Sequence, residues 1–346
     1  MKKSALSVFI MITIFLTANG IRFFFFRPDE MFIDIEETYL LNMVYLPAII
    51  GIAALVLLII VFIVKRRISI LLLPFFVISL SLFFLYAYTS IIEPSWLKIY
   101  KYEIRSDKIN DRITIIHVSD IQSGRLGNYE EKVFKTIYDL SPDLIINTGD
   151  LIQPFNPGDY KSEMEKISLL FKQLTSKYKV YNVSGNIDSE LELIRFDKLS
   201  GVKTLNNSVN NIKIKDTNMT LLGLSWPVST NVNNEWIKDR AYRNNNFKII
   251  FGHSPNYMLT ATDHPIDLAL AGHTHGGQII IPFYGPLLTF SKVPKSLAKG
   301  YHKINNTHIN VSSGVGAEHA AGIRSIRLFC RPSITVFTLI PEFYRE

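Results

Sequence analysis

The amino-acid sequence predicts an α/β domain that follows three transmembrane helices. Long apolar runs crowd the first hundred residues, strand-like and helix-like segments alternate after residue 112, and polar residues beside glycine follow successive strands. The chain has 346 residues, a formal net charge of +7 and one cysteine. A single cysteine excludes an intramolecular disulfide and a cysteine-based zinc site. The polar part has no Lys/Arg run interleaved with aromatic residues, so nucleic acid is not an expected partner.

Residues 4–26, 43–64 and 68–92 form the three apolar runs. Each is long enough for the ~20 residues that a helix needs to cross a bilayer. A secretory signal peptide is the alternative for the first run, because Lys2 and Lys3 give it a basic start. Two further apolar runs follow it, which favours a retained helix. We therefore expect a multi-pass membrane segment with the lipid bilayer as a partner.

The distribution of charge indicates how these helices are oriented. Two lysines precede the first run and Lys65-Arg66-Arg67 separates the second from the third, whereas segment 27–40 is rich in Asp and Glu. The positive-inside rule places the N-terminus and the 65–67 turn in the cytoplasm. Three spans then leave the chain after residue 92 on the external, periplasmic face. Arg22 and Arg27 flank the outer end of the first run and argue against this orientation.

Glu93-Pro94-Ser95 follows the third run, and the composition after it is that of an ordinary globular domain. We therefore divide the chain into a membrane anchor, residues 1–95, and a globular domain, residues 96–346. The second part has about 250 residues, a size within the range of a single domain.

The globular part alternates strands with helices. Strands are predicted at 113–117, 144–147 and 180–183, and amphipathic helices at 129–140 and 160–178. Two successive β-α-β steps predict a sheet of parallel strands with helices on its faces. Further strands are predicted at 219–224, 247–251, 266–270, 309–311, 326–330 and 334–339.

Polar side chains beside glycine follow five of these strands. In chain order they are Asp120-Ile121-Gln122, Gly149-Asp150, Gly185-Asn186-Ile187-Asp188, Gly252-His253 and Gly272-His273-Thr274-His275. Ligands of open α/β sheets bind beyond the carboxyl ends of the strands. One such motif alone is more often a turn than a site. Five of them, with oxygen and nitrogen donors and no thiolate, favour a metal site.

The ordered motifs D-x-Q, GD, GN-x-D, GH and GHTHGGQ resemble those of the calcineurin-like metallophosphoesterase superfamily. The GHTHGGQ block most resembles its membrane-associated bacterial branch, and the resemblance covers about residues 113–340. It implies a four-layer α/β/β/α sandwich, a bacterial inner or plasma membrane location, and two divalent metal ions at the strand ends. Mixed oxygen and nitrogen donors suit Mn²⁺, Fe or Zn²⁺.

The resemblance also implies the ligands of each metal. One metal would be held by Asp120, Gln122, Asp150 and His275. The other would be held by Asp150, Asn186, His253 and His273, so that Asp150 bridges the two. The catalytic role is assigned to Asp150, Asn186 and His253.

Two positions depart from the family's usual pattern. Gln122 replaces a histidine, although its amide oxygen can still bind a metal. Ile187 replaces the histidine that is thought to stabilise or protonate the leaving group, and isoleucine carries out no proton chemistry. The next residue, Asp188, is expected to orient a ligand such as His253 from behind.

Other polar residues are weaker candidates. His117 lies inside an apolar strand and is expected to be a satisfied core residue. His319 lies in a loop that the resemblance places near the site, where it could touch substrate. Arg324 and Arg327 could bind phosphate, but arginines that flank a strand are usually solvated.

These observations predict a membrane-anchored, metal-dependent phosphohydrolase that cleaves a phosphoester or pyrophosphate bond. Tethering raises the effective concentration at the membrane, which favours a phosphorylated, lipid-linked substrate. The superfamily includes hydrolases of UDP-diacylglucosamine, but that reaction needs a cytoplasmic site, whereas phospholipid or undecaprenyl-type phosphates suit the external face. The alternative is a metal-binding or sensor protein with the same fold and impaired catalysis. Ile187 favours that alternative, and the retained ligands disfavour it.

Overall fold

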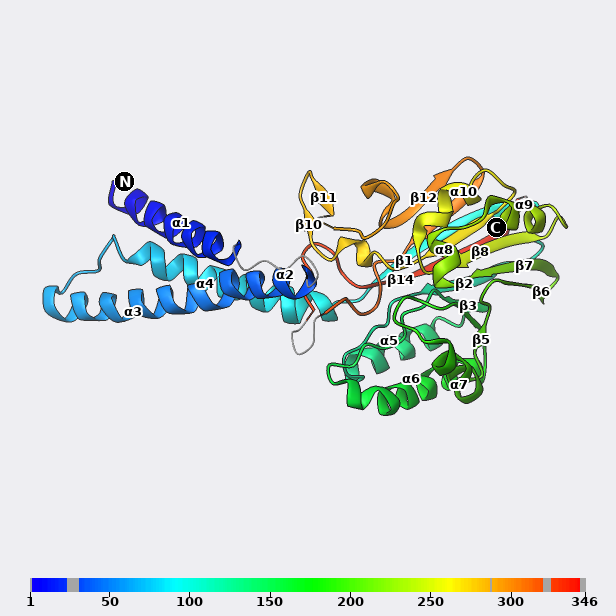
Figure 1. The fold of residues 1–346 in the computed structure, drawn as a ribbon, viewed down its shortest axis with the longest axis horizontal. Coiled ribbons are helices and arrows are strands. Elements are labelled where there is room, and N and C mark those ends of the chain that lie inside the picture. The colour runs from blue at the N-terminus through cyan, green and yellow to red at the C-terminus, as the bar shows by residue number, and fades with distance from the viewer. Residues whose placement is uncertain (1, 24–30, 287, 320–324, 343–346) are drawn as a thin grey trace. The chain divides into compact units, whose positions relative to one another are not determined.

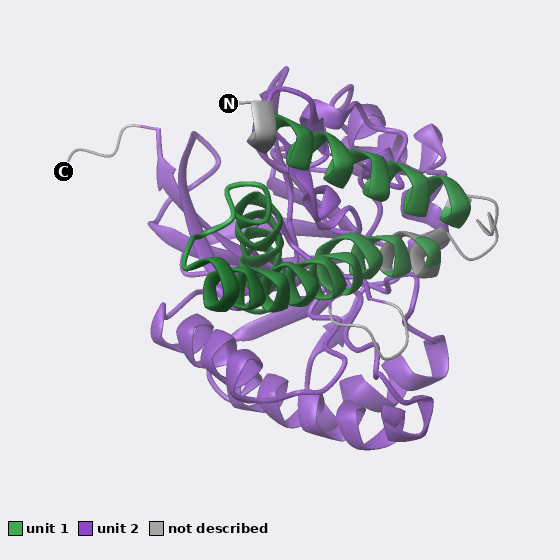
Figure 2. Cartoon of the chain, turned by 90° about the vertical axis from the view of Figure 1, so that its left-hand side faces the viewer, with its two compact units in different colours: residues 1–92 green, residues 93–346 purple. Residues whose placement is uncertain are grey.

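The computed structural model describes residues 2–23, 31–286, 288–319 and 325–342. The chain forms two compact units, residues 1–92 and 93–346, which are coloured separately in Figure 2. Arg27 and Arg324, both considered above, lie outside the described residues.

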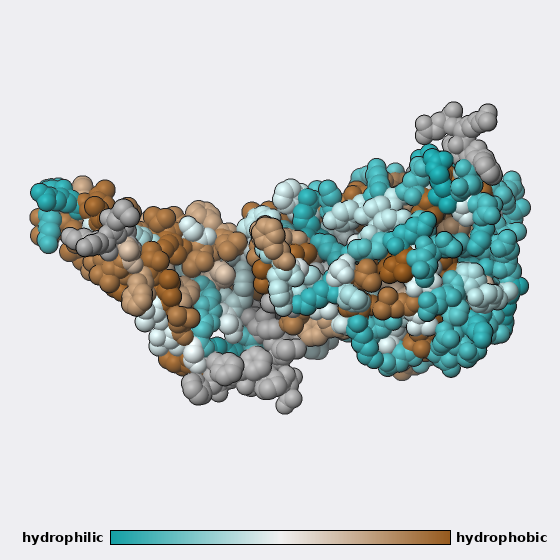
Figure 3. Space-filling view, turned by 90° about the horizontal axis from the view of Figure 1, so that it is seen from above, coloured by the Kyte–Doolittle hydropathy of each residue, from teal (hydrophilic) through white to brown (hydrophobic). Residues whose placement is uncertain are grey.

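Unit 1 is helical (Figure 1). It contains α1 (Lys2–Phe23), α2 (Met31–Leu40), a π-helical turn (Leu41–Tyr45), α3 (Leu46–Lys65), α4 (Leu73–Ala87) and a second π-helical turn (Tyr88–Ile92). Three stretches are long and apolar enough to cross a membrane, namely Ala5–Arg22, Glu37–Lys65 and Leu73–Ser95. The outward-facing side chains of this unit are mostly apolar (Figure 3). The three predicted apolar runs therefore form helices of the expected kind.

The charge of Arg22 is compensated within unit 1. Its guanidinium pairs with the buried carboxylate of Asp34 and lies 2.7 Å from the carboxylate of Glu37. Arg22 is therefore neutralised by acidic side chains of the helix that follows it.

Unit 2 contains two six-stranded sheets and a short hairpin. The strands of the first sheet are β1 (Lys98–Ser106), β2 (Ile113–Val118), β3 (Leu144–Asn147), β4 (Lys179–Asn182), β5 (Lys203–Thr204) and β14 (Ser333–Pro341). Those of the second are β6 (Ser208–Ile214), β7 (Thr217–Leu224), β8 (Phe247–Gly252), β9 (Leu268–Ala271), β12 (Gly300–Ile304) and β13 (Thr307–Val311). The hairpin consists of β10 (Ile280–Ile281) and β11 (Gly285–Pro286).

The helices of unit 2 connect these strands. They are α5 (Asn128–Asp139), α6 (Tyr160–Thr175), α7 (Glu190–Ser200), α8 (Trp226–Thr230), α9 (Asn234–Ala241) and α10 (Met258–Ala261). Short 3-10 turns occupy Glu93–Ser95, Pro157–Asp159, Pro255–Tyr257, His275–Gly277 and Lys295–Leu297.

The strand order brings the expected strand ends together. The first sheet runs β1-β14-β2-β3-β4-β5 and the second runs β12-β13-β9-β8-β7-β6. Strands β2, β3 and β4 are parallel to one another, as are β7, β8 and β9. Within each group the carboxyl ends therefore lie along one edge of the sheet. Strand β14 runs antiparallel to β2, which makes the first sheet mixed.

Neighbouring strand residues show the four layers of unit 2. Ile115 packs in the core between the two sheets, while Ile116 packs in the core that includes residues of α5, α6 and α7. Ile249 shares the inter-sheet core, while Ile250 packs with residues of α9 and α10. Successive side chains of a strand point to opposite faces, so each sheet is buried on both sides. The expected α/β/β/α sandwich is confirmed (Figure 1).

The structure corrects one predicted strand. Residues 326–330 were expected to form a strand, but among them only Leu328 forms an isolated bridge, to Ile279. The side chain of Arg327 is buried among backbone carbonyl groups instead, as described below. The chain is therefore held there by a side chain rather than by a ladder of backbone hydrogen bonds.

Candidate metal centre

Seven predicted donors lie just beyond the carboxyl ends of five strands. Asp120 and Gln122 follow β2, and Asp150 follows β3. On the other side of the site, His253 directly follows β8. The remaining donors are Asn186 after β4, and His273 and His275 after β9.

Most of these donors have a left-handed backbone conformation. The φ angles are 50° at Asp120, 37° at Gln122, 57° at Asp150, 69° at His273 and 48° at His275. Residues other than glycine rarely adopt this region, and each costs of order 1–3 kcal/mol. Such strain concentrates where a fold holds side chains in a functional arrangement. The turns after β2, β3 and β9 are therefore locally destabilised by the conformation that places their side chains in the candidate metal centre.

Two glycines allow the strand ends to approach one another. A Cβ atom on Gly185 would lie 1.9 Å from Oδ1 of Asp150, and one on Gly272 would lie 2.3 Å from Oδ2 of Asp120. Any side chain at either position would displace a carboxylate of the site. The glycines in the GN and GH motifs are therefore needed for space as well as for the turn.

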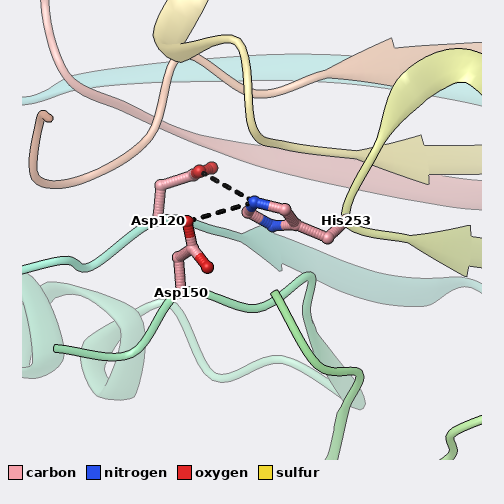
Figure 4. Close-up of side chains that lie close together, drawn as sticks. All are labelled: Asp120, Asp150 and His253. Carbon is pink, nitrogen blue, oxygen red and sulfur yellow. Dashed lines mark ion pairs between the residues drawn. The ribbon is translucent and has the colours of Figure 1, made fainter. Parts of the chain in front are cut away.

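Asp120, Asp150 and His253 form the centre of the cluster. One donor atom from each lies within 4.8 Å of the others, and all three residues are buried. Nε2 of His253 is 3.1 Å from Oδ2 of Asp150 and 3.9 Å from Oδ1 of Asp120 (Figure 4). The two carboxylates come from the first sheet and the imidazole from the second, so the cluster joins the sheets.

The other histidines extend this cluster on two sides. Oδ1 of Asn186 is 3.0 Å from Nε2 of His253 and 3.0 Å from Nδ1 of His273. Nε2 of His275 is 3.6 Å from Oδ1 of Asp120. The structure thus places Asn186 and His273 beside His253, and places His275 beside Asp120.

Gln122 is oriented by a residue that the motifs do not include. Its Nε2 group donates to Oε2 of Glu318 at 2.7 Å and to Oε1 of Gln153 at 2.9 Å. The amide nitrogen faces these two acceptors, and its buried Oε1 atom has no partner among the described residues. The oxygen is thereby left available for a cation.

Replacing Glu318 by leucine is expected to weaken metal binding by ~10–100-fold, the usual cost of losing a partner that orients a ligand. The amide of Gln122 would lose one of its two acceptors and could rotate. Glu318→Gln retains an acceptor oxygen and should be closer to the natural protein. Titration of metal-free protein with Mn²⁺ by calorimetry measures the difference, with the exposed Glu103→Leu as control. An unchanged affinity in Glu318→Leu would show that Glu318 does not orient Gln122.

The electrostatics of the cluster favour a cation. Burial raises the pKa of Asp120 to about 6, although the field of His253 opposes this change. Burial disfavours charge on His253 as well, but Asp150 and Asp120 raise its pKa to about 9. The field that favours a proton on His253 also favours a metal ion between these carboxylates.

The other two histidines remain neutral, as metal ligands must. Burial lowers the pKa of His273 to about 4. Burial and the positive charge of Arg327 lower the pKa of His275. A neutral imidazole presents a free lone pair to a cation near neutral pH.

The residues present fit divalent metal. Among the described residues, the buried atoms Asp120 Oδ2, Gln122 Oε1 and His275 Nδ1 have no hydrogen-bond partner. Buried polar atoms are normally satisfied, so unpaired atoms clustered in one place need an explanation. Carboxylate, amide and imidazole donors are also the set that Mn²⁺, Fe and Zn²⁺ accept.

Asp188 does not orient His253, which corrects the sequence-based expectation. Its carboxylate accepts hydrogen bonds from the backbone N–H groups of Asp150 at 2.8 Å, Leu151 at 3.0 Å and Gly185 at 2.8 Å. Nδ1 of His253 lies 2.7 Å from the carbonyl oxygen of Thr148 instead. Asp188 therefore joins the turns after β3 and β4, and the main chain orients His253.

Arg327 is neither solvated nor available to substrate, contrary to both readings of the sequence. Its side chain is fully buried and donates to the carbonyl oxygens of Ser313 at 2.6 Å, Cys330 at 2.8 Å and Gly316. It also approaches the carbonyl oxygen of His275 at 3.4 Å. The guanidinium thus holds the loops that surround the turn after β9.

The two remaining histidine candidates are buried. His117 is buried, with Nε2 3.0 Å from Oγ1 of Thr148 and Nδ1 2.8 Å from Nδ2 of Asn310, which confirms the core assignment. His319 is 6% exposed and packs edge-on against Phe155, so it does not present its ring as a surface group.

Sequence reasoning missed several residues of the site, among them Gln153, Glu318 and Trp226. Glu318 lies far from the strand motifs, and no local pattern marks it. Trp226 follows β7, so the strand-end rule could have found it. Its ring lies 4.6 Å from that of His273 and 5.4 Å from that of His253, measured between centroids.

Comparison with known proteins agrees with this geometry. The sequence profile of the calcineurin-like phosphoesterase family matches residues 113–277. The metallophosphoesterase YkuE of Bacillus subtilis is 30% identical over 264 residues, which cover 73% of this chain and 89% of that protein. The phosphodiesterase YaeI of Escherichia coli is 24% identical, with 74% of this chain and 93% of that protein covered. Among solved structures, NAD nucleotidase (NadN) of Haemophilus influenzae is 13% identical with a TM-score of 0.43, covering 63% of this chain and 55% of that one.

The matched region contains all five strand-end motifs and the buried cluster of Asp120, Asp150 and His253. With the extent of the similarity to YkuE, this shows that the chain belongs to the calcineurin-like phosphoesterase family and is a metal-dependent phosphoesterase.

Proposed function

We propose that this protein is a membrane-anchored phosphohydrolase with two metal ions, which cleaves a phosphoester or pyrophosphate bond in a lipid-linked substrate. The observation that carries the proposal is the distribution of donors around Asp150. Asn186 and His273 gather beside His253 on one side, and His275 lies beside Asp120 on the other. Seven donors are more than one such ion needs. If Asp150 binds both ions, each ion has four donors.

Two divalent cations bound there would neutralise phosphoryl oxygens and lower the pKa of a water molecule that attacks phosphorus. The chain's own residues supply the arrangement. Asp150 places its carboxylate between the two donor sets, and the hydrogen bond from Ile187 N to Oδ1 of Asp150, at 3.2 Å, helps fix its orientation. Asn186 is exposed beside the buried His253 and can position a phosphoryl group. Mn²⁺, Fe and Zn²⁺ all suit these donors.

The substrate class follows from the anchor and from Ile187. The apolar stretches of unit 1 suit a multi-pass anchor in a bacterial inner or plasma membrane. An enzyme held at a bilayer meets lipid-linked phosphates at high effective concentration. Because Ile187 donates no proton, bonds whose leaving group is already stable as an anion are favoured. The name of YaeI, a phosphodiesterase, is in keeping with a diester or pyrophosphate substrate.

Unit 2 is proposed to lie on the external face of the membrane. An alkaline phosphatase reporter fused after Glu346 should therefore be active without breaking the cells. A reporter fused after Arg67, in the basic turn that follows α3, should be inactive and serves as the matched control. The orientation is wrong if the phosphatase fused after Glu346 is inactive while a reporter that functions only in the cytoplasm is active at the same position. A cytoplasmic lipid precursor then becomes the better substrate.

A further inference from the structure

Three phenylalanines of unit 2 are exposed and held in a left-handed backbone conformation. The φ angles are 67° at Phe283, 48° at Phe290 and 55° at Phe329, and the side chains are 111%, 45% and 60% exposed. Bulky residues rarely adopt this conformation, and exposed phenylalanine gains nothing from water. Strain that presents apolar rings to the outside indicates that something covers them.

Phe283 lies at the tip of the β10–β11 hairpin. The N–H of Tyr284 donates to the carbonyl oxygen of Ile281 at 3.1 Å, which closes a turn with Pro282 in second place and Phe283 in third. A turn with positive φ at its third residue normally has glycine there. Ile281 and Tyr284 are also exposed, at 42% and 61%. We call Ile281, Phe283, Tyr284 and Phe329 the apolar tip.

Phe329 is tied to the point where the chain leaves its third apolar stretch. That stretch is Leu73–Ser95, and its last three residues belong to unit 2. The buried carboxylate of Glu93 accepts hydrogen bonds from the backbone N–H groups of Phe329 at 3.1 Å and Cys330 at 2.6 Å. Covalent connection therefore keeps Phe329 close to the end of this stretch.

The hairpin is fixed beside Phe329. The N–H of Ile280 donates to the carbonyl oxygen of Leu328, and the N–H of Leu328 donates to that of Gln278, both at 2.9 Å. The hairpin also starts shortly after His275, and the carbonyl oxygen of Phe290 is 3.2 Å from Nε2 of His273. One continuous piece of structure thus links the end of the apolar stretch, the apolar tip and the metal centre.

Cationic side chains flank the aromatic rings. Nζ of Lys295 is 2.9 Å from the hydroxyl of Tyr284 and 4.1 Å from the centre of its ring. The guanidinium of Arg331 lies 4.0 Å from the ring centre of Trp96, which is itself half exposed. Aromatic rings with adjacent Lys and Arg are typical of the interface between lipid and water, where the cations meet anionic headgroups.

We propose that the apolar tip inserts into the headgroup layer of an anionic phospholipid bilayer and holds the metal centre at the level of the lipid phosphates. This inference rests on the membrane anchor of the proposed function, because the anchor supplies the bilayer. A second copy of the chain is the competing occupant of the same surface.

The test uses the full-length protein in nanodiscs of phosphatidylcholine and phosphatidylglycerol. A polarity-sensitive fluorophore is attached to Phe283→Cys, and quenching by spin-labelled lipid is measured. Val56→Cys in α3 reports on the anchor. Tyr242→Cys, 65% exposed directly after α9 at the other end of unit 2, is the matched control (Figure 1). The native Cys330 is buried, so labelled natural protein gives the background.

Quenching is expected at position 283 with labels near the headgroup and at position 56 with labels in mid-chain, but not at position 242. Quenching at 56 without quenching at 283 overturns the inference and leaves the anchor in place. Absence of quenching at both positions overturns the anchor as well. A blue-shifted, unquenched probe at 283 that depends on protein concentration shows that a second copy covers the tip, which also overturns the inference. Equal metal content in all variants verifies that they are folded.

Discussion

Replacing Asp150 by asparagine is expected to abolish metal binding and hydrolysis together. In the proposed arrangement this carboxylate is shared by the two donor sets, and its Oδ2 lies 3.1 Å from Nε2 of His253 while its Oδ1 accepts from the N–H of Ile187. Asparagine keeps the shape but removes the charge that the two proposed cations would share. The loss of kcat/KM should exceed the ~10²–10³-fold that follows removal of a single stabilising donor.

Elemental analysis and hydrolysis of an aryl phosphodiester measure the two effects. Asp139→Asn makes the same chemical change at an exposed position on α5, where the carboxylate pairs only with Lys135, and should alter neither. If Asp150→Asn kept its full metal content, Asp150 would not be a bridging ligand.

Replacing Ile187 by histidine is expected to accelerate hydrolysis of esters with poor leaving groups far more than that of good ones. A positioned general acid contributes ~10²–10⁴-fold, but only where the departing oxygen must gain a proton. The backbone N–H of Ile187 donates a hydrogen bond to Asp150, so the side chain of residue 187 begins beside the candidate metal centre. Phosphate and nucleotide leaving groups are stable as anions and need no such help.

The measurement is kcat/KM for aryl phosphodiesters of graded phenol pKa. The natural protein should show the steeper dependence on the leaving group, and Ile187→Leu, which adds no acid, should match it. Equal slopes for Ile187→His and the natural protein would show that this residue does not determine leaving-group choice. A natural protein without activity, rescued only by histidine, would favour the sensor alternative.

The donors could be found from the sequence because each lies at a strand end. Asp120 and Asp150 follow neighbouring parallel strands, so their ends lie together, whereas His253 follows a strand of the second sheet, which packs against the first. The spacing of apolar residues predicted the alternation of strands and helices, and the length of the apolar runs predicted the apolar helices. Local patterns were sufficient for these features because each is encoded in a short, continuous stretch of sequence.

Glu318 and Arg327 could not be found in this way. Glu318 orients Gln122 from 196 residues away, and Arg327 binds carbonyl oxygens of Ser313, Gly316 and Cys330, so both roles depend on tertiary contacts that no strand or helix pattern marks. Asp188 illustrates the same limit, because the motif marks it as part of the site but does not reveal that it binds backbone amides. The wrong strand at 326–330 arose because an apolar pattern does not show where a partner strand lies.

The position of β14 has a consequence for biosynthesis. This last strand lies between β1 and β2, and it is the sheet partner of β1, which begins unit 2. On the ribosome, β1 therefore has no neighbour to pair with until residues 333–341 have been made. Contacts between the ends of a long sequence form slowly, and unpaired strands aggregate. Strand β1 must accordingly stay unpaired, or be held by a chaperone, until β14 has been made.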